Sequence, residues 1–395
     1  MGLFSKPKKK GNLVAIFDIG SGSVGGALAL IEKNKVPTIL TSTRSLIKFQ
    51  DELDFKIFLE DTIEALGKVA DTLYHTKIGA PTEIVCTLSS PWYLSESRVI
   101  KIEKDKKFVF DKDFADDLVK KEIDKLKKDY DKKYSELEGK FNLIENQITS
   151  IKLNGYSIKD PMNKKVRRVE MNMVTSLSPD ICVSRIRDVL SKTFHHIPIE
   201  FSSFVNSTHI ALCDKYQKVD SYVFIDMGGE ITDVNIFNHN ILENSISFPF
   251  GYQTFYRFLK KKLKKDLSEV KSLFNLYFND DLEEEEKEKM EKALKSISGS
   301  WTEAFHQSIE SLGNPVMMLP NQIFIIANSD IVKWFSEIVS NEEYVRSVFV
   351  GSDYYINTLE GADFNNMCSV RNTTYDSFLI IETIAVSKKK TCLKI

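Results

Sequence analysis

Two short segments, about two hundred residues apart, carry the residues most suited to chemistry. Each is an apolar strand that ends in an aspartate, followed by a turn of glycines and hydroxyl residues and then by a second apolar strand. The first segment spans residues 14–30 and contains Asp18, Gly20, Ser21, Gly22 and Ser23. Glycines let backbone N–H groups approach a guest closely, and the serine hydroxyls add donors, so this turn suits an anion.

Asp18 ends its strand at a place where it would act on a metal ion or on the waters of that ion. Direct contact between a carboxylate and a phosphate would be repulsive, whereas Mg²⁺ prefers oxygen ligands. A single turn of this kind could equally be an ordinary hairpin turn.

The second segment, residues 221–237, contains Asp226, Gly228, Gly229 and Thr232. Two such hairpins can hold the phosphates of a nucleotide from both sides, so the repeat favours a binding site.

The paired hairpins resemble the phosphate-1 and phosphate-2 loops of the actin-like ATPase superfamily, and within it the bacterial FtsA and PilM group. The resemblance covers most of the chain. It implies an α/β fold of two actin-like, ribonuclease H-like domains that flank a nucleotide cleft, with an inserted α+β subdomain called 1C. It also implies that ATP and Mg²⁺ are the cofactors, with Asp18 and Asp226 holding the magnesium through water.

Residues 91–178 resemble the 1C subdomain that separates the FtsA and PilM group from actin, Hsp70 and sugar kinases. Residues 98–103 alternate like a strand, a charged helix opens at residues 111–113, and a strand leads into the Asn154-Gly155 turn. An Asp160-Pro161 turn then precedes an alternating strand over residues 166–177. By the resemblance, 1C is a surface for protein partners or self-association.

The remaining domain boundaries follow from the same resemblance. We expect a flexible basic tail over 1–10, domain IA over 11–90 and 179–216, and domain IIA over 217–252 and 320–387. Residues 253–319 are helical and highly charged and resemble the small IIB subdomain, a second candidate surface for protein partners. A second basic tail over 388–395 completes this division.

Two departures from the family pattern affect the site. Ala327, Asn328 and Ser329 stand where the adenosine turn usually has paired glycines; Asn328 and Ser329 remain the predicted adenosine contacts. Glu230 stands where the phosphate-2 loop commonly has a third glycine. A carboxylate about 4 Å from a phosphate costs roughly a few kcal/mol, so Glu230 must point away, reach the magnesium or weaken binding. With Asp18, Asp226 and Glu230 as catalytic candidates, we expect at most a slow ATPase.

Composition excludes several classes of protein. The 395 residues carry a formal net charge of −2, so there is no global attraction for nucleic acid. The five cysteines are scattered without metal-binding spacing, as in a reduced cytosolic protein. No apolar run approaches the eighteen residues of a membrane span, and we expect a cytoplasmic protein, with the inner face of the membrane as an alternative location.

Both chain ends bear on membrane attachment. Leu3 and Phe4 precede a run of lysines in the first ten residues, which could bind an anionic leaflet peripherally; a disordered leader is the alternative. FtsA proteins typically end in an amphipathic membrane helix, and the last residues here instead read as a simple basic tail after lysines 388–390.

Three functions remain open. The favoured one is an FtsA-like, ATP-switched scaffold that polymerises or recruits partners in cell division. The second is a PilM-like component of a type IV pilus apparatus, in which 1C and the neighbouring domain grip a peptide from an inner-membrane partner. The third is a small-molecule kinase of the same superfamily, against which the 1C resemblance argues.

Overall fold

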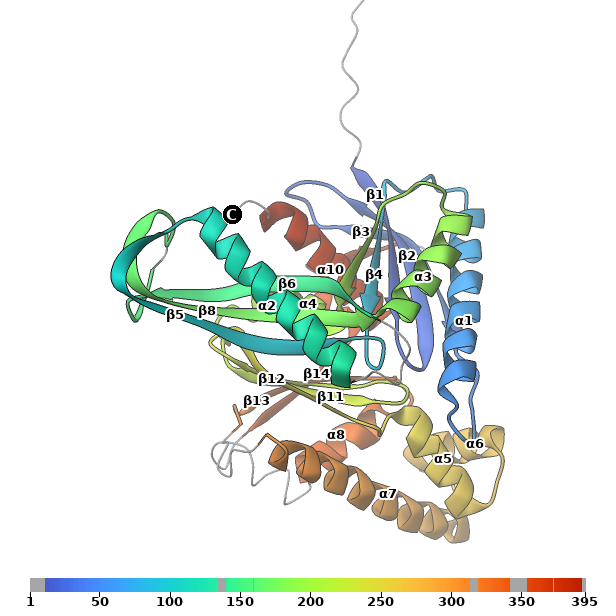
Figure 1. Ribbon diagram of the computed structural model, residues 1–395. Coiled ribbons are helices and arrows are strands. Elements are labelled where there is room, and N and C mark those ends of the chain that lie inside the picture. The colour runs from blue at the N-terminus through green and yellow to red at the C-terminus, as the bar shows by residue number, and fades with distance from the viewer. Residues whose placement is uncertain are drawn as a thin grey trace, which may run out of the picture.

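The computed structural model describes residues 11–133, 140–158, 160–312, 319–341, 354–371 and 373–392. These residues form three β-sheets with helices packed against them (Figure 1). The predicted N-terminal basic tail and the last three residues lie outside the described residues, so the predictions made for them are not tested.

The first sheet has six strands, with β1 near its centre. In spatial order they are β15 (Ser369–Val370), β3 (Thr38–Leu46), β2 (Ser23–Ile31), β1 (Asn12–Ile19), β4 (Glu83–Leu88) and β9 (Ile199–Ser203). The helices α1 (Phe55–His75) and α3 (Asp180–Thr193) pack together on one side, and α4 (Phe204–Lys215) and α10 (Ser377–Cys392) pack together on the other (Figure 1). This double cover explains the unbroken apolar run of β1, in which residues 14–17 are fully buried.

The second sheet has five strands. In spatial order they are β12 (Ile241–Phe248), β11 (Thr232–Asn238), β10 (Tyr222–Met227), β13 (Gln322–Ala327) and β14 (Tyr355–Thr358). One face packs on α5 (Tyr252–Leu263), α6 (Leu267–Phe278), α7 (Glu284–Glu310) and α8 (Val332–Asn341). Val223 and Ile225 of β10 face this helical layer, whereas Tyr222 and Phe224 join the core around the first sheet, because alternate side chains of a strand point to opposite faces.

A four-stranded antiparallel sheet lies between β4 and α3 in the chain, and we call residues 94–179 the insert. Its strands, in spatial order, are β5 (Leu94–Phe110), β8 (Lys164–Pro179), β6 (Phe141–Leu153) and β7 (Tyr156–Ser157). The charged helix α2 (Lys112–Lys133) lies across one face (Figure 1), where Leu118 and Leu126 are buried. The predicted strands, charged helix and Asn154-Gly155 turn are therefore confirmed as local structure.

The end of the described chain returns to the first sheet. The strand β15 pairs with β3, and α10, which follows the 3₁₀ helix η2 (Gly361–Phe364), packs against α4, β1 and β2. The sequence analysis groups residues up to 387 with the second domain and expects a basic tail from 388, whereas α10 continues through Lys388 and Lys389 to Cys392. Local sequence patterns do not reveal such long-range packing, and the domain division itself stays a prediction.

Candidate functional site

Two similar hairpins meet at the candidate site. In β1 and β2, Asp18 lies opposite Gly25, and in β10 and β11, Asp226 lies opposite Asp233. Both loops close with the same backbone bond: Gly20 N–H donates to the Ser23 carbonyl over 3.2 Å, and the corresponding bond in the second loop is 2.9 Å. The internal repeat predicted from sequence is therefore a repeat of structure.

A cleft of about 550 Å³ lies where the two hairpins meet. Most of the predicted site residues line it, namely Asp18, Gly20, Ser21, Gly22, Ser23, Asp226, Gly228, Gly229, Asn328 and Ser329. Residues that the sequence analysis did not identify also line it, among them Arg44, Tyr252, Lys333, Tyr375 and Asp376. The fold thus brings both predicted loops and the predicted adenosine turn to one cavity.

The two glycine loops touch each other directly. A Cβ built on Gly229 would lie 2.3 Å from the backbone nitrogen of Gly22 and 2.4 Å from the Ser21 carbonyl oxygen. The Glu230 N–H donates to Ser21 Oγ over 3.0 Å. In this arrangement the loops bind one another, and a phosphate could enter between them only if they moved apart.

Glu230 and Thr232 do not line the cleft. Both Glu230 oxygens accept from Arg257 of α5, at 2.6 and 2.8 Å, and the pair is largely buried. The Thr232 hydroxyl donates to the Phe250 carbonyl. Of the three outcomes considered for Glu230, the structure therefore shows that it points away, and this position gives no support to a catalytic role for it or a phosphate-binding role for Thr232.

Arg44 of β3 is the main site residue that sequence reasoning missed. Its Nη2 lies 2.7 Å from Asp18 Oδ2, and Nη1 donates to Ser23 Oγ over 2.8 Å. Its Nε and Nη2 donate to the two oxygens of Asp376 over 2.7 and 2.9 Å. The glycines at positions 25 and 26 in β2 could have indicated such a residue, because a glycine within a strand often marks the close approach of another group. A Cβ on Gly25 would lie 2.5 Å from Arg44 Nη2.

Acidic groups surround this guanidinium. Burial raises the pKa of Asp18, although Arg44 acts in the opposite direction. Burial would lower the pKa of Arg44, but Asp18 and Asp376 together raise it above its ordinary value. Glu382 of α10 is fully buried nearby, and burial, followed by the charge of Asp18, holds its pKa well above its usual range.

The second hairpin carries its own pair of acids. Burial, followed by the charges of Asp233 and Asp18, raises the pKa of Asp226 well above its usual range. Burial also raises the pKa of Asp233 to about 6, although Ser90 and Ser247 donate hydrogen bonds to its Oδ1 and act in the opposite direction. Ser90 follows β4 of the first sheet, and Asp233 lies on β11 of the second sheet. The hydrogen bond between them therefore joins the two halves of the molecule, one built on each sheet.

The donor set does not fit the expected magnesium ion. Asp18 Oδ1 and Asp226 Oδ1 are buried without a hydrogen-bond partner, which alone would suit a cation. The other Asp18 oxygen, however, is bound by Arg44, and a guanidinium repels a divalent ion at the same carboxylate. The described part of the chain holds no group of three or more His, Cys, Asp or Glu residues placed to bind a metal. Mg²⁺ commonly needs only one or two carboxylates besides phosphate and water, so it is the pairing of Asp18 with Arg44 that opposes the ion here. The prediction of magnesium at Asp18 therefore lacks structural support.

The predicted adenosine turn forms without the paired glycines of the family pattern. It follows β13, where the Asn328 side chain accepts from the Asp330 N–H over 2.9 Å and the Asn328 carbonyl accepts from the Ile331 N–H over 3.1 Å. These bonds form an Asx-type turn, for which asparagine suffices. Leu359, Tyr375 and Phe378 add apolar surface to the same cavity.

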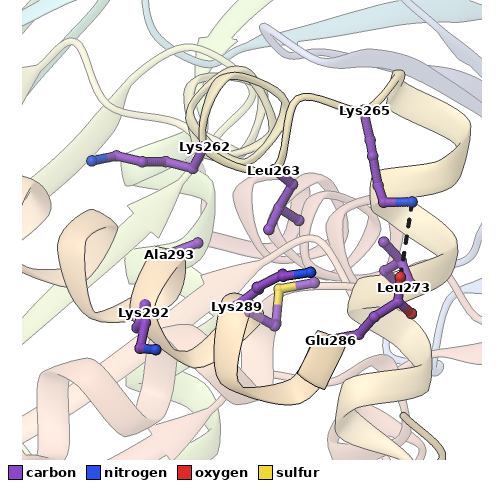
Figure 2. Close-up of a pocket in the computed structure, with 9 residues that line it drawn as sticks. Lys262, Leu263, Lys265, Leu273, Glu286, Lys289, Lys292 and Ala293 are labelled. Atoms are coloured by element: carbon purple, nitrogen blue, oxygen red, sulfur yellow. Dashed lines mark ion pairs between the residues drawn. The ribbon is translucent and has the colours of Figure 1, made fainter. Parts of the chain in front are cut away.

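A separate hollow of about 390 Å³ lies between α5, α6 and α7 (Figure 2). Four lysines line it: Lys262, Lys265, Lys289 and Lys292. Lys265 pairs with Glu269 and Glu286, Lys289 with Glu285 and Lys292 with Glu288. Three of the four charges are thus paired within the protein, as is common for charged helix faces.

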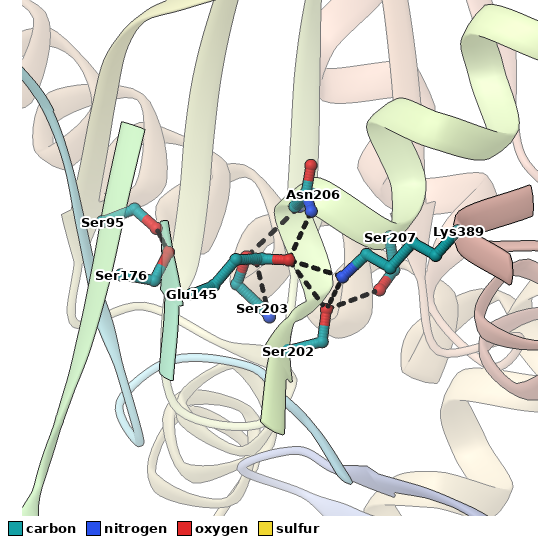
Figure 3. Close-up of polar contacts among 8 residues, drawn as sticks. All are labelled: Ser95, Glu145, Ser176, Ser202, Ser203, Asn206, Ser207 and Lys389. Carbon is teal, nitrogen blue, oxygen red and sulfur yellow. Dashed lines mark hydrogen bonds and ion pairs between the residues drawn. The ribbon is translucent and has the colours of Figure 1, made fainter. Parts of the chain in front are cut away.

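A polar cluster joins the insert to the first sheet (Figure 3). A bulge in β6 turns Glu145 toward the end of β9, where it accepts from Ser203 N–H and Oγ and from Asn206 Nδ2. Lys389 of α10 reaches the same carboxylate at 2.5 Å and also donates to Ser202 over 2.9 Å. We call these five residues the Glu145 cluster.

No protein-family model matches the sequence, and no curated protein matches it. Among solved structures, a chain of the PilM–PilN type IV pilus biogenesis complex superposes with a TM-score of 0.62 at 11% identity, over 96% of this chain and 98% of that chain. The ethanolamine utilization protein EutJ from Carboxydothermus hydrogenoformans gives a TM-score of 0.45 at 8% identity, over 96% of this chain and 90% of that one. The chain therefore has the actin-like α/β fold that the sequence predicted, with a PilM structure among its neighbours.

None of the helices in the described residues has the length and apolar character that a membrane span requires.

Proposed function

We propose that this chain is a PilM-like assembly protein of a type IV pilus machine, which holds a cytoplasmic peptide of a membrane-embedded partner. The observation that carries this proposal is the superposition on the PilM–PilN complex, which extends over nearly the whole of both chains. The comparisons give no specific support to the division function that the sequence analysis favoured.

The peptide site that we propose lies where the insert meets the first sheet. The strand β6 pairs with β7 only at Lys152 and Leu153, so within the described chain residues 144–150 have no strand partner on that edge. The strand β9 is likewise the last strand of its sheet. Unpaired edges of this kind bind extended peptides by adding a strand. Leu143 and Ile148 on β6 are exposed and provide apolar contact.

Site-specific photocrosslinking in the producing cells tests this proposal. A photoreactive amino acid replaces Ile148 in the full-length protein, and the adduct is identified by mass spectrometry. We expect a covalent adduct with the cytoplasmic segment of a protein that has a membrane span. A matched control carries the same amino acid at Tyr74, an even more exposed side chain on α1, and should give no such adduct.

Two results would contradict the proposal. Adducts only with a second copy of this chain would favour a filament, and equal adducts from Ile148 and Tyr74 would show non-specific contact. Sedimentation with ATP separates these cases further, because an adaptor of this kind should remain in the supernatant.

For the cleft, we propose ATP as the ligand and a switch between open and closed arrangements as its effect. Its cavity is lined by both glycine loops, by the adenosine turn and by apolar surface, which together suit a nucleotide. Ser21, Gly22, Ser23 and Gly229 would bind the phosphates after the loops part. Hydrolysis is not part of this proposal, because Glu230 points away from the cavity.

A further inference from the structure

Arg44 lines the cleft, and the proposed function does not yet use its charge. We propose that its guanidinium is the cleft's own cation and takes the place of magnesium, so that a nucleoside polyphosphate binds here without a divalent metal. This inference rests on the proposal that ATP is the ligand of the cleft.

The position of Arg44 is fixed by three neighbours that all line the cleft. Asp18, Ser23 and Asp376 bind its three guanidinium nitrogens over 2.7 to 2.9 Å. The ring of Phe378 lies 5.3 Å from the guanidinium carbon, within the range of a cation–π contact. A cation held this firmly is part of the site rather than a mobile surface charge.

The backbone opposite Arg44 leaves room for the guanidinium. Gly25 pairs with Arg44 across β2 and β3, and any side chain at position 25 would overlap it. Asp18 lies opposite Gly25 on the other side of β2. The guanidinium therefore crosses over a glycine to reach the aspartate of the first phosphate loop.

Asp376 shows how a phosphate would bind. Its two oxygens occupy Nε and Nη2 together, which is the bidentate geometry that arginine offers equally to a carboxylate or a phosphate. A phosphate chain in the cleft would replace Asp376 at Nε and Nη2 of Arg44, while Asp18 would stay paired with the guanidinium. Competition from Asp376 should therefore limit affinity in the wild type.

At Asp18, Arg44 already provides the positive charge that a divalent ion would supply. A magnesium ion placed as the family resemblance implies would neutralise both the phosphates and Asp18. Here Arg44 is already paired with Asp18 and lines the cavity. A second cation beside it would be repelled.

Calorimetric titration of the full-length protein with ATP tests this inference, once in excess EDTA and once in excess Mg²⁺. We expect two dissociation constants that differ by less than roughly threefold. Wild-type binding that appears only with Mg²⁺ would overturn the inference and leave ATP as the ligand. The absence of binding in both buffers would overturn both, without affecting the crosslinking test of the peptide site.

Two variants test whether Arg44 supplies the positive charge that ATP binding needs. Arg44→Gln should weaken binding in EDTA by about tenfold or more relative to binding in Mg²⁺, because the site then needs an external cation. Asp376→Asn should instead tighten binding in EDTA, because the competitor for the fork loses its charge. Asparagine still accepts the Leu379 N–H at the start of α10, so this variant keeps its helix cap even if Arg44→Gln fails to fold.

Lys333→Gln is the matched control, because Lys333 also lines the cleft but forms no ion pair with Asp18, Asp226 or Asp376. Loss of the Lys333 charge should weaken ATP binding equally in both buffers, so the ratio of the two dissociation constants should stay unchanged. Two results would contradict the inference. One is weaker ATP binding in EDTA by Asp376→Asn than by wild type. The other is the same ratio of the dissociation constants in EDTA and Mg²⁺ for wild type and a folded Arg44→Gln protein.

Discussion

At the scale of single residues, the site is unusual for the number of acids that it buries. Asp226 and Asp233 face each other across a strand pair, and Asp18 approaches from the other hairpin. Of these three aspartates, Asp18 has a cationic partner, whereas Asp233 accepts from two serine hydroxyls. Such an arrangement makes the folded state take up protons more readily than the unfolded chain does.

Asp233→Asn should change how stability depends on pH. The pKa of Asp233 is about 6 in the folded protein against 3.8 for the unperturbed group. Between these values the folded state holds the proton and the unfolded state does not, so stability falls as the pH rises through this window and then levels off. Denaturant unfolding from pH 3.5 to 7 should show wild type losing about 3 kcal/mol relative to the variant.

Ser247→Ala serves as the comparison for this experiment. It keeps the carboxylate but removes a hydrogen bond that lowers the pKa of Asp233, so the window should extend to higher pH. Parallel stability curves for wild type and Asp233→Asn would contradict the assignment.

At the scale of elements, α10 connects the cleft to the insert. Asp376 caps its first turn and binds Arg44, Glu382 is buried near Asp18, and Lys389 ends in the Glu145 cluster. One helix thus contacts both the proposed nucleotide site and the proposed peptide site. This continuity gives the proposed switch a physical route, because a rigid helix moves as one body.

Lys389→Met should loosen the junction between insert and first sheet. Methionine keeps the length of the side chain but leaves the largely buried Glu145 with neutral donors only. We expect a loss of about 1–3 kcal/mol in unfolding free energy and faster amide exchange at Ser203 and the start of α4. Lys292→Met, which breaks an exposed pair on α7, should cost about 0.5 kcal/mol at most. Equal effects of the two substitutions would show that the Glu145 cluster is not structural.

At the scale of the whole molecule, a second link joins the two halves away from the cleft. Arg257 of α5 binds Glu230 and also donates from Nε to the Gln50 carbonyl over 2.6 Å, in the loop between β3 and α1. Phe49 of this loop lies 5.5 Å beneath the guanidinium. Glu230 thus serves the architecture here, in the place where the family pattern has a glycine.

Arg257→Met should destabilise the whole molecule more than the double variant Glu230→Gln/Arg257→Met. The single change leaves a buried carboxylate without its partner, which costs about 3–5 kcal/mol, whereas the double change removes that charge as well. A double-mutant cycle by denaturant unfolding measures the coupling. Strictly additive effects would mean that the two side chains do not depend on each other.

The sequence by itself determined the two hairpins, their aspartates and glycines, the actin-like fold and the local structure of the insert. The hairpins and the elements of the insert follow from apolar runs, turn residues and periodicity, which act over short stretches. The actin-like fold follows from the family resemblance of the paired hairpins. Most of the predicted site residues therefore line one cleft.

Tertiary structure alone decided which partners these residues have. Arg44 and Asp376 are more than three hundred residues apart, and Glu230 and Arg257 meet only because α5 packs against the loop after β3. No local pattern encodes such distant ion pairs, because they depend on how sheets and helices pack. For the same reason the sequence could not show that α10 returns to the first sheet, that the glycine loops touch, or that an arginine stands where a magnesium ion was expected.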